Sequence, residues 1–524
     1  MKSSIINRYN LPHSMKFFTC LFIALLLPQT VCRADDAISQ WACFDSHGKL
    51  VYQTLPGGDR IMDFSYAGYG GGGVAIPDFT VKATVSPGHA DADDSPAIQD
   101  AIDKVSRMEI ARGHRGAVLL SPGIFNCRST LNITASGVVL RGSEGTILRL
   151  SGPAHLAINI SGKKTVTPVG HPLRIKDEYV PSGTDAFNVE YPQGLAAGDT
   201  IQIVRPVTRA WVEFMGMANL LRNDRQQRWL SGNLDAERVI KSVDGNRITV
   251  TVPLSDSYDA KYLDPPGATA AKVTVSGVIS QVGLEHVRIE CPPQAVGISF
   301  PSYQSIHVDD AVDAWVRDVQ IANTIGAVDI LAGASRVTVQ RVSVTHEEAT
   351  IGAAKPGDFG ADGTQTLFDQ CTGTGNNLFY LITMGRLQGP NVALHCTFHG
   401  NGHIEPHMRW STGLLLDNCK VVGSGGIDLM NRGIMGSGHG WTMGWGVAWN
   451  CSAKELLIQE PPGAMNWAIG CQGNPTNQPM PGTKQPMLPS GEFDSQGTPV
   501  SPASLYLAQL RQRLGPDAVK NIGY

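Results

Sequence analysis

The chain has 524 residues, of which 42 are lysine or arginine and 46 are aspartate or glutamate. This slight acidic excess argues against a generally basic, nucleic-acid-binding surface. Glycine supplies 58 residues, roughly 11 % against the usual ~7 %, which suits a folded chain with many tight turns.

Residues 1–34 have the pattern of a secretory signal peptide. Three basic residues precede an apolar run from Phe17 to Leu27, and the segment ends at the small residue Ala34. The run is too short to span a bilayer. We therefore expect a secreted or periplasmic protein that has no membrane association after cleavage. Cleavage would remove four basic residues and no acid, leaving 38 Lys and Arg against 46 Asp and Glu.

Residues 35–114 are predicted to form an N-terminal segment that ends in a helical cap. Asp94 or Ser95 is a plausible N-cap, and Pro96 suits the first helical turn. An apolar stripe at helical spacing follows, made of Ala97, Ile98, Ala101, Ile102 and Val105. Short apolar runs then begin near Gly116 and Gly137, so residues 115–164 are predicted to form the first β coils.

Three phrases in this region resemble the pectate-lyase-like superfamily. They are Asp-Asp-Ser-Pro-Ala-Ile-Gln-Asp-Ala-Ile at 93–102, Gly-Ile-Phe at 123–125 and Val-Val-Leu-Arg-Gly at 138–142. The resemblance covers roughly residues 60–160 and 275–475. It implies a secreted right-handed parallel β-helix that acts on carbohydrate, as polysaccharide lyases and glycoside hydrolases of that superfamily do. Epimerases and phage-type binding proteins share the fold, and the Ca²⁺-binding aspartate pattern of classical pectate lyases is missing. The reaction therefore stays open, and pectate is disfavoured as the substrate.

Residues 165–270 interrupt the coil rhythm. The stretches Gly198–Val204 and Asn246–Val252 alternate as strands do, and a mixed segment from Trp211 to Arg238 lies between them. We predict a β-rich insertion beside the coils that walls one end of a substrate groove.

Residues 271–473 are predicted to form the main β-helix. Five cysteines recur at intervals of 20 to 32 residues, and each closes a short apolar phrase; they are Cys371, Cys396, Cys419, Cys451 and Cys471. Val319 and Val342 extend the series upstream. A repeat with one apolar strand per unit indicates a solenoid. We expect these thiols to stack inward as small hydrophobes. Whether Cys43, Cys127 and Cys291 form disulfides is left open.

Counting from each cysteine places residues of successive coils above one another. Glu405 and Asp428 both lie nine residues on, and Arg409 and Arg432 lie thirteen residues on. Because side chains alternate along a strand, these four should share one solvent-facing side, with rungs roughly 4.8 Å apart. Tyr380 lies nine residues after Cys371 and is placed in the same outward row.

This row suits cleavage of a uronic-acid polysaccharide by β-elimination. Arg409 and Arg432 would neutralise the substrate carboxylate. His407, with a pKa lowered by the two guanidiniums, would be the base, and His439 or Tyr380 would supply a proton. Six further residues are predicted to bind substrate, namely Glu405, Asp428, His403, Trp410, Asn431 and Trp441. A solvated face of acid–base pairs that only stabilises the coils is the alternative without function.

Two other chemistries use the same residues. Glu405 and Asp428 about 5 Å apart would match the ~5–5.5 Å carboxyl separation of a retaining glycoside hydrolase, although arginines beside both would hold them ionised. A divalent metal at His403, Glu405 and His407 is disfavoured because two arginines would repel it. We expect no cofactor, and an acidic polysaccharide or oligosaccharide, not nucleic acid, as the partner. A non-catalytic glycan-binding β-helix is a further alternative.

Residues 474–524 are predicted to form a Pro- and Gly-rich tail and a terminal helix. Leu505–Leu514 has helical spacing, and Gly515 and Pro516 follow it. This helix is expected to cover the last coil, as a solenoid end requires.

Overall fold

The computed structural model describes residues 37–89, 92–294, 300–348, 355–484 and 486–524. The predicted signal peptide at 1–34 lies outside the described residues. Within them, no helix is long and apolar enough to cross a membrane.

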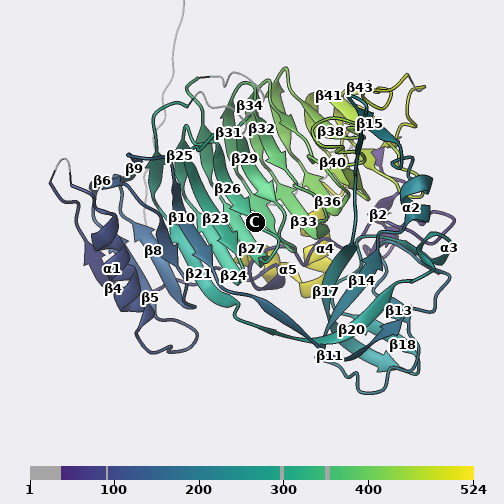
Figure 1. Cartoon of the computed structure of the whole chain (residues 1–524), viewed down its shortest axis with the longest axis horizontal. Coiled ribbons are helices and arrows are strands. Elements are labelled where there is room, and N and C mark those ends of the chain that lie inside the picture. Colours follow the sequence, from purple (N-terminus) through teal and green to yellow (C-terminus); the bar gives the residue numbers. More distant parts are fainter. Residues whose placement is uncertain (1–36, 90–91, 295–299, 349–354, 485) are drawn as a thin grey trace, which may run out of the picture. The chain divides into compact units, whose positions relative to one another are not determined.

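The chain folds as a right-handed parallel β-helix with three parallel strand ladders, and the strands of successive coils lie side by side in chain order (Figure 1). Ladder 1 contains β4 (Val81–Val85), β5 (Gly116–Leu120), β8 (Val138–Gly142), β21 (Ile279–Glu285), β24 (Ala311–Arg317), β27 (Ser335–Gln340), β30 (Leu367–Asp369), β33 (Gln388–Leu394), β36 (Ser411–Asp417), β40 (Val447–Trp449), β42 (Trp467–Ile469) and β44 (Glu492–Asp494).

The strands of the other two ladders belong to one hydrogen-bonded sheet. Ladder 2 contains β6 (Gly123–Cys127), β9 (Thr146–Leu150), β22 (Arg288–Glu290), β25 (Gln320–Ala322), β28 (Ser343–Thr345), β31 (Thr372–Gly375), β34 (Thr397–Gly400) and β37 (Lys420–Gly423). Ladder 3 contains β7 (Leu131–Ile133), β10 (Leu156–Ser161), β23 (Gln304–Asp309), β26 (Gly326–Ile330), β29 (Gly357–Ala361), β32 (Phe379–Ile382), β35 (His403–Ile404) and β38 (Gly426–Leu429). Two long strands, β41 (Ser452–Ile458) and β43 (Gln472–Thr476), finish both ladders.

The cysteine ladder is confirmed at the corner between ladders 1 and 2. All five cysteines are buried, and each thiol donates to a backbone carbonyl of the preceding rung at 3.2 to 3.5 Å. The residue before each cysteine has a φ between 51° and 66°. Asparagine or glycine is favoured in this left-handed region and stands there at Asn418, Asn450 and Gly470. The eight described cysteines are all free thiols.

Replacing a thiol of this ladder with a larger side chain is expected to destabilise the coils. Burial raises the pKa of the Cys419 thiol, which is fully buried with Cys396 and Cys451 as its neighbours. Cys419→Leu adds volume to a filled site and should cost about 1–3 kcal/mol of stability. Cys43→Leu, at a half-buried strand position, is the control and should change stability by less than about 0.5 kcal/mol. Equal thermal midpoints for the two variants would contradict a packed ladder.

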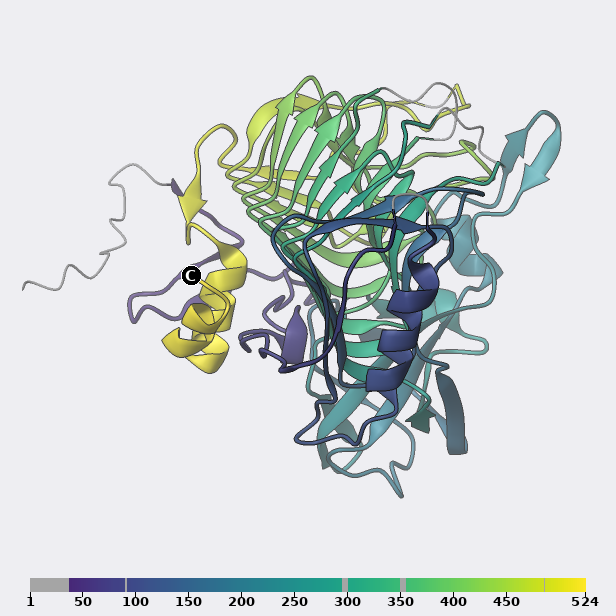
Figure 2. The same ribbon diagram turned by 90° about the vertical axis from the view of Figure 1, so that its left-hand side faces the viewer.

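The first coil is closed by α1 (Ser95–Ser106), which packs against β4 to β8 and lies across that end (Figure 2). Its buried residues Ile98, Ile102 and Val105 join the core inside the coil. Asp94 is the N-cap residue, but its carboxylate accepts hydrogen bonds from the backbone of Gly88 and Asn126. The cap therefore ties the helix to β6.

The C-terminal helices cover the outside of ladder 1. They are α4 (Leu505–Leu514) and α5 (Pro516–Asn521). Asp417 of β36 accepts from Ser504 Oγ and from the Tyr506 N–H, both at 2.8 Å, and Tyr524 donates to Asp369 of β30. The prediction that the terminal helix covers the last coil is wrong, because these carboxylates hold it against earlier rungs.

The insertion is a separate antiparallel sheet beside the coils (Figure 1). Its strands, in sheet order, are β11 (Thr165–Arg174), β20 (Thr269–Ser276), β14 (Thr200–Pro206), β17 (Asn233–Asp244), β18 (Arg247–Val250) and β13 (Ala186–Asn188). Smaller elements complete it, namely β12 (Tyr179–Val180), β19 (Tyr258–Asp259), α2 (Arg209–Phe214), α3 (Ala260–Leu263), β15 (Leu220–Arg222) and β16 (Arg225–Gln227). Other short elements are β1 (Ala37–Ile38), β45 (Val500–Ser501), β2 (Ala42–Phe44), β3 (Leu50–Tyr52), β39 (Met443–Gly444) and the 3₁₀ turn η1 (Tyr69–Gly71).

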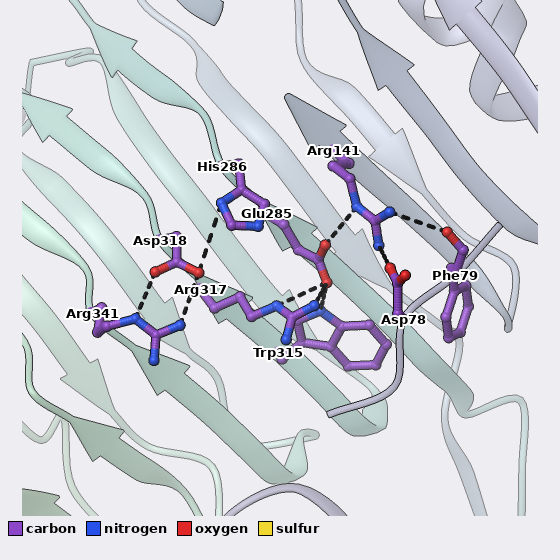
Figure 3. A network of polar contacts seen from close by, with 9 residues as sticks. All are labelled: Asp78, Phe79, Arg141, Glu285, His286, Trp315, Arg317, Asp318 and Arg341. Atoms are coloured by element: carbon purple, nitrogen blue, oxygen red, sulfur yellow. Dashed lines mark hydrogen bonds and ion pairs between the residues drawn. The ribbon is translucent and has the colours of Figure 1, made fainter. Parts of the chain in front are cut away.

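A buried carboxylate fastens the N-terminal segment to ladder 1 (Figure 3). Glu285 has no exposed side-chain surface and pairs with Arg141 and with Arg317, each at 2.8 Å. The Trp315 indole also donates to it at 2.7 Å. Arg141 also pairs with Asp78 at 2.7 Å, and this ion pair links the N-terminal segment to ladder 1.

Candidate active site

Five of the residues predicted for the site meet at the C-terminal ends of strands β35 and β38 in ladder 3. Ile404 of β35 pairs with Ile427 of β38, so the next residues, Glu405 and Asp428, follow on adjacent rungs. Arg432 Nη1 lies 3.0 Å from Glu405 Oε1 and 2.7 Å from His407 Nδ1. His403 Nδ1 lies 2.7 Å from Asp428 Oδ2. We call Glu405, Asp428, Arg432, His403 and His407 the carboxylate cluster.

The carboxylate cluster is much less exposed than a solvated face would be. Glu405, Asp428 and Arg432 are 8 %, 6 % and 6 % exposed. The prediction that they face open solvent is therefore wrong. Charges removed from water in this way must be paired or change their protonation state.

Glu405 is the group whose protonation state responds most clearly. Burial raises the pKa of its carboxyl to about 7, against the opposing charge of Arg432 and with help from the negative charge of Asp428. Although Arg432 forms an ion pair with Glu405, Oε1 has no aligned hydrogen bond among the described residues. Burial therefore prevails over the poorly aligned arginine, and Glu405 holds a proton up to near-neutral pH.

His407 is neutral, as predicted, but burial is the main cause. Burial and then Arg432 lower its pKa to about 3. Arg432 can only donate, so Nδ1 of His407 accepts its hydrogen bond. The neutral ring then carries its proton on Nε2. In this arrangement His407 offers a donor to a ligand, and its lone pair is already occupied.

His403 and Asp428 form the other half of the cluster. The hydrogen bond that His403 donates to Asp428 raises the pKa of His403, outweighing burial. His403 therefore stays protonated to a higher pH than a free histidine would. His403 keeps about a third of its side-chain surface exposed, so this side of the cluster is open to a ligand.

Arg409 and His439 lie next to the carboxylate cluster. Arg409 and Arg432 do not stack on each other, although each lies thirteen residues after a ladder cysteine. The Arg409 backbone N–H donates to His439 O, and its guanidinium donates to Ser437 Oγ at 2.6 Å. Residues 430–442 form an excursion between rungs, so a fixed offset fails beyond Asp428. The His439 ring lies 4.8 Å from that of His407, and burial, followed by nearby arginines, lowers its pKa to about 4.

Tyr380 lies elsewhere than predicted. Its ring is fully buried inside the coil and stacks on Phe398 at 4.8 Å. The pairing of β32 with β35 shifts register between Phe379 and Leu381. This irregularity turns Phe379 outward and Tyr380 inward, so Tyr380 cannot donate a proton to a bound glycan.

Three predicted substrate-binding residues are covered by the insertion. Trp410 is 2 % exposed and donates to Asp256, while Trp441 is equally buried and donates to Met215 O. Asn431 is 1 % exposed beside Met217. These side chains anchor the insertion to the coil, and a sugar ring has no access to them.

Sequence reasoning missed two residues at the edge of the cluster. Phe379 lies edge-on to His407, with 5.1 Å between ring centroids. Lys355 is exposed, lies over the Phe379 ring at 5.3 Å, and contributes to the lowered pKa of His407. The repeat identified Phe379 as a strand residue. No local sequence pattern indicated that Lys355 lies at the edge of the carboxylate cluster.

The alternative metal site is not assembled in this arrangement. His403 pairs with Asp428, and the Nδ1 atom of His407 faces Arg432. In the part of the chain that the structure describes, no three His, Cys, Asp or Glu side chains converge as a metal-binding group.

Searches against family models and against curated proteins gave no match. Among solved structures, the chain is similar to the gp54 tailspike of Acinetobacter baumannii bacteriophage AP22, determined in complex with a capsular saccharide, at 12 % identity and a TM-score of 0.33. The match covers 78 % of this chain and 73 % of that one. The gp49 tailspike of Pseudomonas phage LKA1 matches at 14 % identity and a TM-score of 0.36, covering 77 % and 72 %. The tailspike of E. coli bacteriophage HK620, as a mutant in complex with a pentasaccharide, matches at 11 % identity and 0.43, covering 81 % and 66 %.

These similarities are distant, and the fold is defined by the three ladders. No family model or curated protein matches, so membership of the pectate-lyase-like superfamily stays a resemblance.

Proposed function

We propose that this protein is a β-helical enzyme that cleaves a polysaccharide, and that it does so by hydrolysis at Glu405 and Asp428. The observation that carries this proposal is the different surroundings of two carboxyl groups on adjacent rungs. Glu405 keeps a proton to a pKa of about 7, whereas Asp428 is paired with His403. Two carboxyl groups in such contrasting environments have the properties of a glycosidase acid and its anionic partner.

In this mechanism Glu405 protonates the leaving glycosidic oxygen. Asp428 bonds to the anomeric carbon as the glycosidic bond breaks, and water, which gives its proton back to Glu405, then hydrolyses the glycosyl ester. Adjacent rungs lie about 4.8 Å apart, close to the ~5–5.5 Å separation that accompanies retention of configuration. His407 donates from Nε2 to a sugar hydroxyl. Arg432 holds the imidazole ring of His407 in place.

β-Elimination, the reaction favoured from sequence, is the second candidate. Exposed Lys355 and Arg409, whose guanidinium contacts Ser437, favour it because cations beside the cluster could neutralise a uronic acid. Its weakness is the base, because the free lone pair that His407 needs is taken by Arg432. A non-catalytic glycan-binding β-helix remains the third candidate. Export by a signal peptide, an acidic glycan as substrate and the absence of a cofactor remain parts of the proposal.

The test is incubation of the purified protein with a panel of neutral and uronic-acid polysaccharides, without added metal. Hydrolysis is expected to release reducing ends without ultraviolet absorbance from an unsaturated sugar. Proton NMR of the first product should show retained anomeric configuration. Unsaturated products would favour β-elimination, and binding without any cleavage would favour the binding protein.

A further inference from the structure

A cleft of about 590 Å³ lies between the insertion and the corner that joins ladder 3 to ladder 1. One wall comes from β14 and β17 of the insertion and includes Gln202 and Asp235. The other comes from turns of the coil and includes Asp362 and Arg386. Figure 1 labels β14 and β17, from which the first wall comes. The insertion was predicted to form a wall of a groove, and these residues make up that wall. None of them belongs to the carboxylate cluster.

Arg238 holds the two walls together. It is 3 % exposed, and its guanidinium donates across the gap to Gly389 O at 2.8 Å and within the insertion to Pro253 O at 3.2 Å. Arg238 lines the cleft, and its buried Nε atom has no hydrogen-bond partner among the described residues. A buried N–H without a partner costs free energy, which is offset here by the two hydrogen bonds that join the walls.

Two of the cations that line the cleft are paired with carboxylates. Lys164 pairs with Glu237 at 2.6 Å, and Arg336 donates to Asp313 at 2.8 Å. Arg386 donates to Ser231 O at 2.7 Å and lies near Asp235. Arg386 is exposed and, like Arg513, donates only to uncharged oxygens, so an incoming carboxylate would find cations that no described carboxylate pairs. Hydroxyl groups, which both donate and accept, suit the threonine, serine and amide side chains between them.

Asp362 completes the lining on the coil side. It follows β29 and accepts the Met384 N–H at 2.5 Å. Burial and the charge of Asp329 on the preceding rung raise its pKa to about 7. Its protonated form adds a donor at neutral pH. Because β29 and β35 are two rungs apart, Asp362 lies about 10 Å along the ladder from the level of Glu405.

We propose that this cleft binds a short run of sugar rings belonging to the glycan that the Glu405–Asp428 site cleaves. The cleft is held open by Arg238 and offers polar groups on both walls, so it recognises the hydroxyl groups of those rings. The cleavage part of this inference rests on the proposed function. Binding in the cleft does not depend on it.

The experiment measures binding by calorimetry in the Glu405→Gln background. The probes are hexasaccharides of cellulose, chitin and mannan, with those of polygalacturonate and alginate as acidic counterparts. We expect binding of at least one of these probes. Gln202→Trp, which fills the cleft, should weaken that binding about tenfold or more. Asp362→Asn should weaken it to a lesser degree, because the amide keeps the shape.

Thr274→Trp is the matched control. Thr274 is exposed on β20 of the same sheet, next to Val275, which lines the cleft, so strand alternation turns Thr274 away. Its binding should equal that of the parent, and thermal midpoints should show that both tryptophan variants are folded. Unchanged binding by a folded Gln202→Trp variant, or no binding of any probe, would overturn the proposal. Binding that depends on the cleft in a protein without cleavage activity would refute only the proposed function.

Discussion

Glu405→Gln is expected to lower kcat by about 10²–10⁴-fold, the usual loss when one positioned acid is removed. Glutamine keeps the size of the side chain but cannot give a proton to the leaving oxygen. Glycan binding should persist, because the neighbouring donors remain. The measurement is release of reducing ends by the variant and the parent on the same polysaccharide.

The pH profile checks the same assignment with the parent enzyme. An acid catalyst works in its protonated form, and the pKa of Glu405 is raised to about 7. Activity should therefore fall as pH rises above 7. Glu455→Gln is the control, since Glu455 pairs with Gly426 one rung beyond β38 and has no place in the carboxylate cluster. A His407→Ala variant that loses more activity than Glu405→Gln would favour β-elimination.

Glu285→Gln is expected to destabilise the folded protein by about 3 kcal/mol, at the low end for breaking a buried ion pair. The carboxylate is fully buried and serves Arg141, Arg317 and Trp315 together (Figure 3). The amide can still accept from the indole, but both guanidiniums lose an anion. Arg141 keeps Asp78, which limits the loss. The shift in thermal midpoint, with activity measured on the folded fraction, tests this.

The matched control is Glu290→Gln in ladder 2. Glu290 also pairs with two arginines, Arg149 and Arg288, at 3.0 Å each. It is partly exposed, so water screens these pairs and the expected loss is about 0–1 kcal/mol. Similar losses for the two variants would mean that burial of Glu285 does not decide the stability of the N-terminal segment.

The sequence by itself determined the repeating parts of this protein. The spacing of Cys371, Cys396 and Cys419 predicted the stacked corner, because each coil repeats the same local turn and contacts only its neighbours. The helices at Ser95–Ser106 and Leu505–Leu514 were predictable from capping residues and apolar spacing. The adjacency of Glu405 and Asp428 followed from the same count.

Only the tertiary structure decided what breaks or covers that repeat. A register shift at Phe379 moved Tyr380 into the core, and the insertion buried Trp410 and Trp441. The protonation of Glu405 and the donor role of His407 depend on burial and on one arginine from the next rung. Local periodicity carries no information about such long-range contacts, because the free energy of a charge depends on everything packed around it.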